Sequence, residues 1–114
     1  MRIYIAAPYP IRHQAVEVMN WLEATGHTVT SRWLRGEVEG NTDENARKDF
    51  DDIASSDALL LINPQDWANV GTGGRHVELG YALAIGITVI LLGVRTNVFH
   101  HHSNVRVIGM LSEL

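Results

Sequence analysis

Glu78 is the side chain in this sequence best placed to do chemistry. It follows a glycine-rich stretch made of Gly71, Thr72, Gly73 and Gly74. Glycines before a helix let the backbone approach a ligand, and free N–H groups at a helix start favour anions. A carboxylate held ionised there and directed into a cleft can attack the anomeric carbon of a sugar. The alternative is an ordinary helix-start glutamate that points to solvent, which is the commoner situation.

A second group of carboxylates lies upstream, where Asp49, Asp51 and Asp52 are followed by Asp57. On a helix, Asp49 shares one face with Asp52 and Ile53, at spacings of three and four residues. A solvated acidic face explains most of such a cluster. Asp57, placed directly before an apolar run, fits the end of a helix that enters a strand.

The composition excludes several other kinds of site. The chain of 114 residues contains no cysteine, so disulfides, thiolate zinc sites and cysteine nucleophiles are excluded and carboxylates remain as nucleophiles. Nine Lys plus Arg against thirteen Asp plus Glu give a net charge of −4. Binding to a nucleic-acid polymer needs a cationic face, which an acidic chain does not favour. The glycine-rich stretch matches neither a Walker loop nor a G-x-G-x-x-G dinucleotide fingerprint.

The elements that must position these residues alternate along the chain. Short apolar or β-branched runs predict strands at 3–7, 27–33, 58–62, 87–92 and 105–108, whereas apolar spacing and caps predict helices at 11–25, 42–55 and 75–85. This alternation predicts one α/β domain over residues 1–114. The expected architecture is a small doubly wound, Rossmann- or flavodoxin-like parallel sheet of four to five strands with helices on both faces.

In such a sheet, ligands bind beyond the carboxyl ends of the strands, near the point where the strand order reverses. Four segments are expected to gather there. They are residues 8–13, the loop after Trp33, residues 63–74 and residues 95–104. The site is therefore expected to be an open cleft formed by short loops.

No segment has the pattern of a membrane span. The longest apolar stretch, residues 85–94, is interrupted by glycine and threonine and falls short of the roughly 20 residues that a bilayer helix needs. The first residues enter a strand pattern without the apolar core of a signal peptide. We expect a cytoplasmic protein with no membrane partner.

Several aromatic and basic residues allow two interpretations. The three histidines at 100–102 are adjacent and cannot all face one ion, so we expect a solvated loop and no metal site. Trp33 and Trp67 follow strands and can either stack on a nucleobase or pack on the surface. Arg75 and His76, at the start of a predicted helix, can meet a phosphate or be exposed.

Three segments, in this order and spacing, carry a family resemblance. They read Tyr4-Ile5-Ala6-Ala7-Pro8, then Asp49-x-x-x-Ile53-x-x-x-Asp57-Ala58-Leu59-Leu60, then Gly71-Thr72-Gly73-Gly74-x-x-x-Glu78-Leu79-Gly80-Tyr81-Ala82. Together the segments resemble the nucleoside 2-deoxyribosyltransferase family, which includes the related deoxynucleoside monophosphate N-glycosidases. The similarity extends from the first strand to about Leu92.

The resemblance implies a role for each matching residue. Glu78 matches the nucleophile that takes the deoxyribosyl group, and Asp49 matches an aspartate that contacts the sugar and assists the departing base. Tyr4 matches a tyrosine that orients the nucleophile. The substrate-binding positions that it implies are Ala6, Pro8, Gly71, Thr72, Gly73 and Gly74, with Thr72 at the sugar 5′ end or its phosphate. Family members also borrow site residues from a neighbouring subunit, and Asn97 is the candidate here.

This sequence also departs from the family pattern at two places. The nucleotide-cleaving branch has Ser and Arg after the first strand, where this chain has residues 8–13, with Arg12 and His13 as substitutes in another register. The transferases tend to have Asp where Thr72 stands. The sequence therefore leaves open whether the substrate is a free nucleoside or a 5′-monophosphate, and whether the reaction is hydrolysis or transfer.

The sequence predicts an enzyme that acts on a small nucleoside or nucleotide. It would cleave or transfer across the N-glycosidic bond through a covalent intermediate on Glu78, without metal or other cofactor. A second subunit would help to close so small a cleft, so we expect a homodimer or larger assembly. One alternative is a glycohydrolase of NAD or another nucleotide derivative. A second is a nucleotide-binding or sensing module without turnover.

Overall fold

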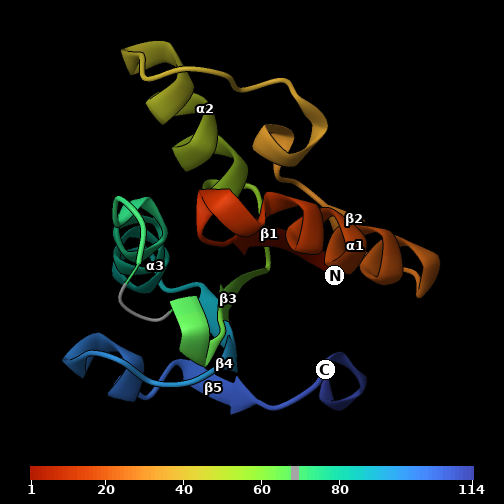
Figure 1. Ribbon diagram of the computed structural model, residues 1–114, viewed down its shortest axis with the longest axis vertical. Coiled ribbons are helices and arrows are strands. Elements are labelled where there is room, and N and C mark those ends of the chain that lie inside the picture. Colours follow the sequence, from red (N-terminus) through yellow and green to blue (C-terminus); the bar gives the residue numbers. More distant parts are fainter. Residues whose placement is uncertain (68–69) are drawn as a thin grey trace.

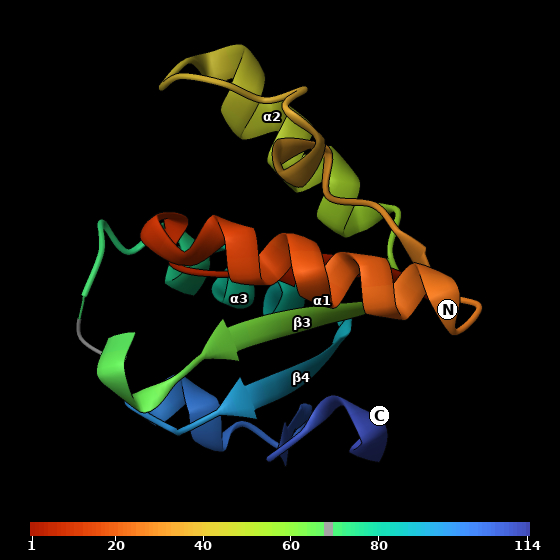
Figure 2. The same cartoon turned by 45° about the vertical axis from the view of Figure 1, so that its right-hand side comes forward.

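The parallel sheet that the sequence predicts is present, with five strands within the described residues. The computed structural model describes residues 1–67 and 70–114 (Figure 1). The strands are β1 (Arg2–Ala6), β2 (Thr28–Val29), β3 (Ala58–Asn63), β4 (Thr88–Gly93) and β5 (Val105–Ile108). They lie in the order β2-β1-β3-β4-β5, and all the pairs are parallel. In Figure 2, β3 and β4 lie side by side and point the same way.

The strand order places the expected ligand site. The chain first adds β2 on one side of β1 and then crosses to add β3 on the other. In a doubly wound sheet with this order, the crevice for ligands opens at the carboxyl ends of β1 and β3. The buried run of β3 (Leu59, Leu60 and Leu61) is fully covered, as expected for a central strand with helices on both faces.

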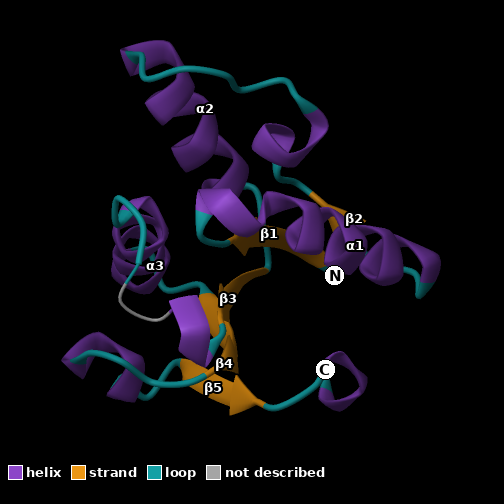
Figure 3. Cartoon of the chain, viewed as in Figure 1, coloured by secondary structure: helices purple, strands orange, loops and turns teal. Residues whose placement is uncertain are grey.

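Helices cover both faces of the sheet, as predicted, with one helix on one face and two on the other (Figure 3). They are α1 (Arg12–Ala24), α2 (Asp43–Ala54) and α3 (Gly74–Ala84). The apolar stripe of α1, with Ala15 and Leu22, packs against the face that carries Ile3 and Ile5. The opposite face carries Tyr4 and packs against α2 and α3. Alternate strand residues point to opposite faces, so the side chain of Tyr4 meets these two helices and not α1.

The second strand is shorter than predicted, because the expectation of a strand over 27–33 is wrong beyond Val29. The hydroxyl of Ser31 accepts from the backbone N–H of Ile5 at 2.7 Å, and the indole N–H of Trp33 donates to the Ile5 carbonyl at 2.9 Å. These side chains occupy the ladder positions of a continued strand. The backbone then turns into a 3-10 helix, Arg32–Arg35. Trp33 is thereby held against β1 by its ring nitrogen.

The histidine segment also differs from expectation. His100 is fully buried, whereas His101 and His102 are exposed. The Nδ1 atom of His100 accepts from the backbone N–H of Thr96 at 2.9 Å, so the ring fixes the loop after β4. The solvated-loop expectation is thus wrong for His100. The predicted loop over 65–74 includes positions 68 and 69, which lie outside the described residues. No helix within residues 1–67 and 70–114 combines the length and hydropathy needed to cross a membrane.

Candidate active site

A hydrogen bond between two elements forms the centre of the candidate site. Tyr4, in the middle of β1, is fully buried, and its hydroxyl donates to Oε2 of Glu78 on α3. Burial, followed by the charges of Glu78 and Asp49, raises the pKa of Tyr4 far above its usual range. The phenol therefore stays protonated and acts as a donor toward a carboxylate.

The Glu78 carboxyl is only partly accessible to solvent. Its burial raises its pKa to about 8, the Tyr4 hydrogen bond opposes this shift, and the charge of Asp49 adds to it. The expectation that the helix start holds this group ionised is therefore wrong for the protein without substrate. The reason is position: Glu78 is the fifth residue of α3, whereas the helix field acts mainly within the first turn.

Asp49 completes a cluster of three titratable groups. It lies on α2, whose start is fixed by the Thr42 side chain, which accepts from the backbone N–H of Asn45 at 3.1 Å. Its Oδ1 atom is buried and has no hydrogen-bond partner among the described residues. Burial, followed by the charge of Asp52, raises the pKa of Asp49 to about 6, against the lowering effects of Tyr4 and Arg32. This carboxyl can hold a proton near neutral pH.

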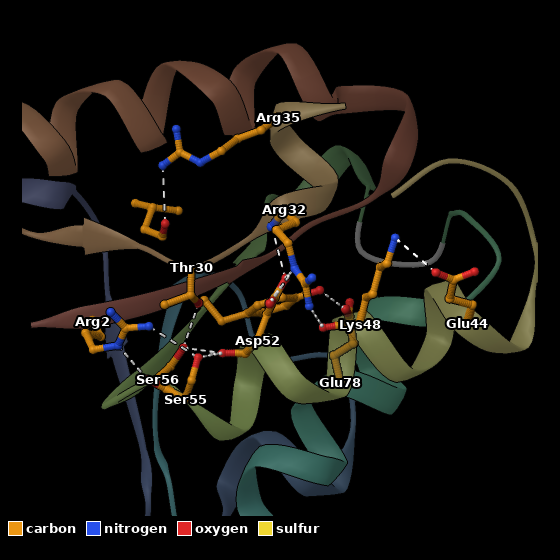
Figure 4. A network of polar contacts seen from close by, with 12 residues as sticks. Arg2, Thr30, Arg32, Arg35, Glu44, Lys48, Asp52, Ser55, Ser56 and Glu78 are labelled. Atoms are coloured by element: carbon orange, nitrogen blue, oxygen red, sulfur yellow. Dashed lines mark hydrogen bonds and ion pairs between the residues drawn. The ribbon is translucent and has the colours of Figure 1, made fainter. Parts of the chain in front are cut away.

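An ion pair that the sequence did not reveal fixes the position of α2. Nε of Arg32 donates to Oδ1 of Asp52 at 2.9 Å, and the Arg32 backbone N–H donates to Oδ2 at 3.1 Å. The guanidinium also reaches the carbonyl of Lys48 at 3.3 Å (Figure 4). Asp52 is thus buried and paired, and not part of a solvated face. The spacing of three residues between Asp49 and Asp52 indicated that they share a helix face. It could not indicate the ion pair, because Arg32 lies 20 residues away in the chain.

Two pockets are lined by segments that carry or flank these residues. The first has a volume of about 280 Å³ and is lined by Val70, Gly71, Gly73, Arg75, His76, Thr96 and Asn97. The second has a volume of about 420 Å³ and is lined by Val38, Gly40, Asn41, Thr42, Asp43, Asn45, Ala46 and Asp49. The first pocket reaches His76, two residues before Glu78 on α3, and the second includes Asp49 itself. The linings differ in charge, because carboxylates occur only in that of the second pocket.

The glycine-rich turn shapes the first pocket. Gly71 and Gly73 have φ angles of 102° and 88°, which side-chain-bearing residues rarely adopt. Gly73 is the residue before α3, so the free N–H groups of the helix start lie beside this pocket. Burial lowers the pKa values of His76 and His100, which favours the neutral form of both rings. Arg75 then supplies the side-chain positive charge of the lining.

The structure brings together some of the predicted residues and separates others. Tyr4, Asp49 and Glu78 form one cluster, while Gly71, Gly73 and Asn97 line the first pocket. Thr72 and Gly74 are exposed in the turn beside it. Ala6 and Pro8 are buried, and the methyl group of Ala6 packs in the core with Tyr4. Asn97 lies in the first pocket of its own chain. No group of three or more His, Asp or Glu within the described part of the chain has the arrangement of a metal site.

Comparisons with known proteins find solved structures with a similar fold. No protein-family model matches the chain, and no curated protein matches it significantly. The chain superposes on the CMP N-glycosidase BcmB of Clostridium botulinum with a TM-score of 0.70 and 24% identity, over 95% of this chain and 87% of that one. It superposes on the 2-deoxyribosyltransferase of Leishmania mexicana with a TM-score of 0.64 and 22% identity, over 84% of this chain and 66% of that one. The likeness at these identities is one of fold.

Proposed function

We propose that the chain is a member of the nucleoside 2-deoxyribosyltransferase family that cleaves or transfers across the N-glycosidic bond of a nucleoside 5′-monophosphate. The observation that carries this proposal is the Tyr4–Glu78 hydrogen bond beside the carboxyl of Asp49. It supplies a nucleophile, an orienting donor and an acid in one place. The fold shared with a CMP N-glycosidase and a deoxyribosyltransferase supports the same chemistry.

The different linings of the two pockets support a substrate orientation. The first presents backbone N–H groups at the start of α3 and contains no carboxylate, which suits the anionic 5′-phosphate. The second includes Asp49 and the amide side chains of Asn41 and Asn45, which suit the hydrogen-bonding edge of a nucleobase. The reaction then requires C1′ of the sugar to reach Glu78, which lies two residues after His76 of the first pocket. A 5′-monophosphate is therefore favoured over a free nucleoside.

The reaction proceeds in two steps. The ionised carboxylate of Glu78 attacks C1′ of the sugar, forming a glycosyl ester as the C1′–N bond breaks. The proton of Asp49 passes to the departing base, which leaves neutral. Water or another base then attacks C1′ and gives its proton to Asp49, which the first step left ionised, while the ester bond breaks and Glu78 is released as a carboxylate. In both steps the Tyr4 hydroxyl orients the Glu78 oxygen to which it donates.

A second copy of the chain, in the cytoplasm, would complete this open site. The side chains of Val98 and Phe99 are 73% and 63% exposed, directly after Asn97 in the first pocket. Exposed apolar side chains at the rim of a polar pocket favour cover by another protein surface. A partner there would exclude water from the glycosyl ester and favour transfer to a base.

The proposal is tested with a panel of nucleosides and their 5′-monophosphates, with and without an acceptor base, read by chromatography of the released base. We expect release from at least one monophosphate and none with Glu78→Ala. Full activity of folded Glu78→Ala would refute the role of Glu78. Nucleotide binding without base release would indicate a sensing module, and release of nicotinamide from NAD alone would indicate a different glycohydrolase.

A further inference from the structure

The side chain of Arg75 points into the protein although the residue lies in the first turn of α3. Arg75 is only 3% exposed. Its Nη1 atom donates to the carbonyl of Val70 and its Nη2 atom to the carbonyl of Trp67, each at 2.9 Å. Nε donates to Oδ1 of Asn63 at 3.4 Å. The guanidinium thus connects the glycine-rich turn to the end of β3.

Asn63 continues this connection to another loop. The residue is fully buried at the end of β3. Its Nδ2 atom donates to the carbonyl of Val94 at 2.7 Å and to Oγ1 of Thr96 at 3.3 Å. One amide therefore accepts from Arg75 on the β3–α3 side and donates to the loop after β4. These are the two segments that provide the walls of the first pocket.

We propose that Arg75 and Asn63 form a brace that fixes the spacing of the two walls of the first pocket. Arg75 is then a positioning residue for recognition of the 5′ group, distinct from the bond-breaking cluster at Glu78. This inference rests on the proposed function, because it assigns the 5′ group to that pocket. In this role the guanidinium does not contact the 5′ group itself; it fixes the backbone segments that bind this group.

The geometry requires arginine at this position. The planar guanidinium presents fixed donors to acceptors on separate segments, whereas a lysine ammonium is a point charge with a different reach. A Cβ added to Gly71 would lie 3.2 Å from Nη1 of Arg75, so the guanidinium sits directly beneath the turn. Arg75→Lys keeps the positive charge and breaks the brace. It therefore separates a positioning role from direct attraction of a phosphate.

The test compares Arg75→Lys with Arg106→Lys, a matched control at an exposed position of β5. Steady-state kinetics are measured for the best 5′-monophosphate of the panel and for its free nucleoside. With Arg75→Lys we expect KM for the monophosphate to rise about 10- to 100-fold, because backbone N–H groups misplaced by a fraction of an ångström bind the phosphate poorly. We expect kcat to change less than about threefold, since bond breaking occurs at Glu78.

A second variant tests the other arm of the brace. Asn63→Asp keeps an acceptor for Arg75 and removes the donor to Val94 and Thr96. It should raise KM for the monophosphate with little change in kcat. It also tests the brace independently if Arg75→Lys fails to fold. Thermal unfolding verifies the fold of each variant. The proposed brace would be overturned by an equal rise in KM for both substrates, by a fall in kcat alone, or by an unchanged KM for the monophosphate.

The experiment distinguishes failure of the brace from failure of the proposed function. If the folded wild-type chain releases no base from any substrate, the proposed function fails. The brace is then tested by calorimetry, which measures the affinity of each variant for the same 5′-monophosphate and for inorganic phosphate. Weaker binding by Arg75→Lys, and not by Arg106→Lys, would support the brace. Equal binding by both variants, or no binding by the wild type, would overturn it.

Discussion

Tyr4 and Glu78 are separated by 74 positions in the chain, yet the hydroxyl of one donates to the carboxyl of the other. The bond joins the central part of the sheet to the helix that follows the glycine-rich turn. It brings a donor that stays protonated to a carboxyl that burial keeps largely protonated. Catalysis by Glu78 therefore depends on how this donor and the neighbouring Asp49 set its ionisation.

Tyr4→Phe should lower kcat/KM by roughly 10- to 100-fold, because a hydrogen bond to a charged group is worth about 1.5–3 kcal/mol. The Tyr4 hydroxyl lowers the pKa values of both Glu78 and Asp49, so its loss should shift the pH profile to higher pH. The measurement is kcat/KM across pH 5–9. A fall in activity without any shift of the profile would assign Tyr4 to packing alone.

The pH profile of kcat/KM should be bell-shaped, with limbs near pH 6 and pH 8. These are the values to which the pKa values of Asp49 and Glu78 are raised. Catalysis needs one proton on the pair, located on Asp49 with Glu78 ionised. This form is a minor fraction of the singly protonated pair, but it follows the same pH dependence as the whole. A profile that is flat between pH 5 and 9 would contradict this coupling.

Asp49→Asn should convert the bell into a single rising limb. Without the acid, the rate depends only on ionisation of Glu78 and no longer falls at high pH. The limb should lie below pH 8, because the charge of Asp49 contributes to raising the pKa of Glu78. We expect a loss of roughly 10²- to 10⁴-fold at the optimum, as for other general acids. A descending limb that persists in Asp49→Asn would assign it to another group.

Glu78→Gln should stabilise the fold at alkaline pH. The pKa of Glu78 is raised from 4.5 to about 8 in the folded chain. Folding then favours the protonated form, so stability is fully present below pH 4.5 and is lost as the pH rises toward 8. At pH 8.5 we expect the Tm of the variant to exceed that of the wild type by several degrees. This corresponds to a difference of at least about 1 kcal/mol in the free energy of unfolding. At pH 4 the two Tm values should be similar.

The control for this prediction is Glu17→Gln, at an exposed position of α1. Its Tm difference from the wild type should not change with pH over the same range. A Glu78→Gln variant that is no more stable than the wild type at pH 8.5 would mean that the carboxyl is well solvated. The same variant should lose measurable turnover at every pH.

Gly93→Ala should severely destabilise the chain, whereas Gly80→Ala should not. A Cβ at Gly93 would lie 2.1 Å from the carbonyl oxygen of Asn63, and its φ is 130°. At Gly80, on the exposed side of α3, nothing lies within 4 Å of an added Cβ. In a helix, Ala is favoured over Gly by about 0.5–1 kcal/mol. Thermal unfolding of both variants tests this, and equal Tm values would contradict the close approach of β3 and β4.

Much of the scaffold could be predicted from local sequence. The continuous apolar runs of β3 and β4 and the cap at Thr42 are local signals, and the structure confirms the elements they predict. Such features are readable because the residues responsible are neighbours in the chain.

The remaining features depend on contacts that form only in the folded chain. Ser31 and Trp33 lie in a β-branched run, but their side chains bond to Ile5 on another strand and end β2 early. His100 is buried within a polar run because its ring accepts from the backbone N–H of Thr96, four residues earlier in the same loop. Arg75 satisfies carbonyls that become buried only when the turn folds over it. The local residue pattern at these positions does not specify such contacts.

The contacts of Ser31 and Trp33 with Ile5 have a consequence for association between chains. Beyond the two residues of β2, the outer side of β1 would be an open sheet edge. Exposed edges recruit strands from other molecules and lead to aggregation. Here the N–H and C=O groups of Ile5 are both occupied by side chains. The sheet therefore cannot be extended at this position by a strand from another molecule.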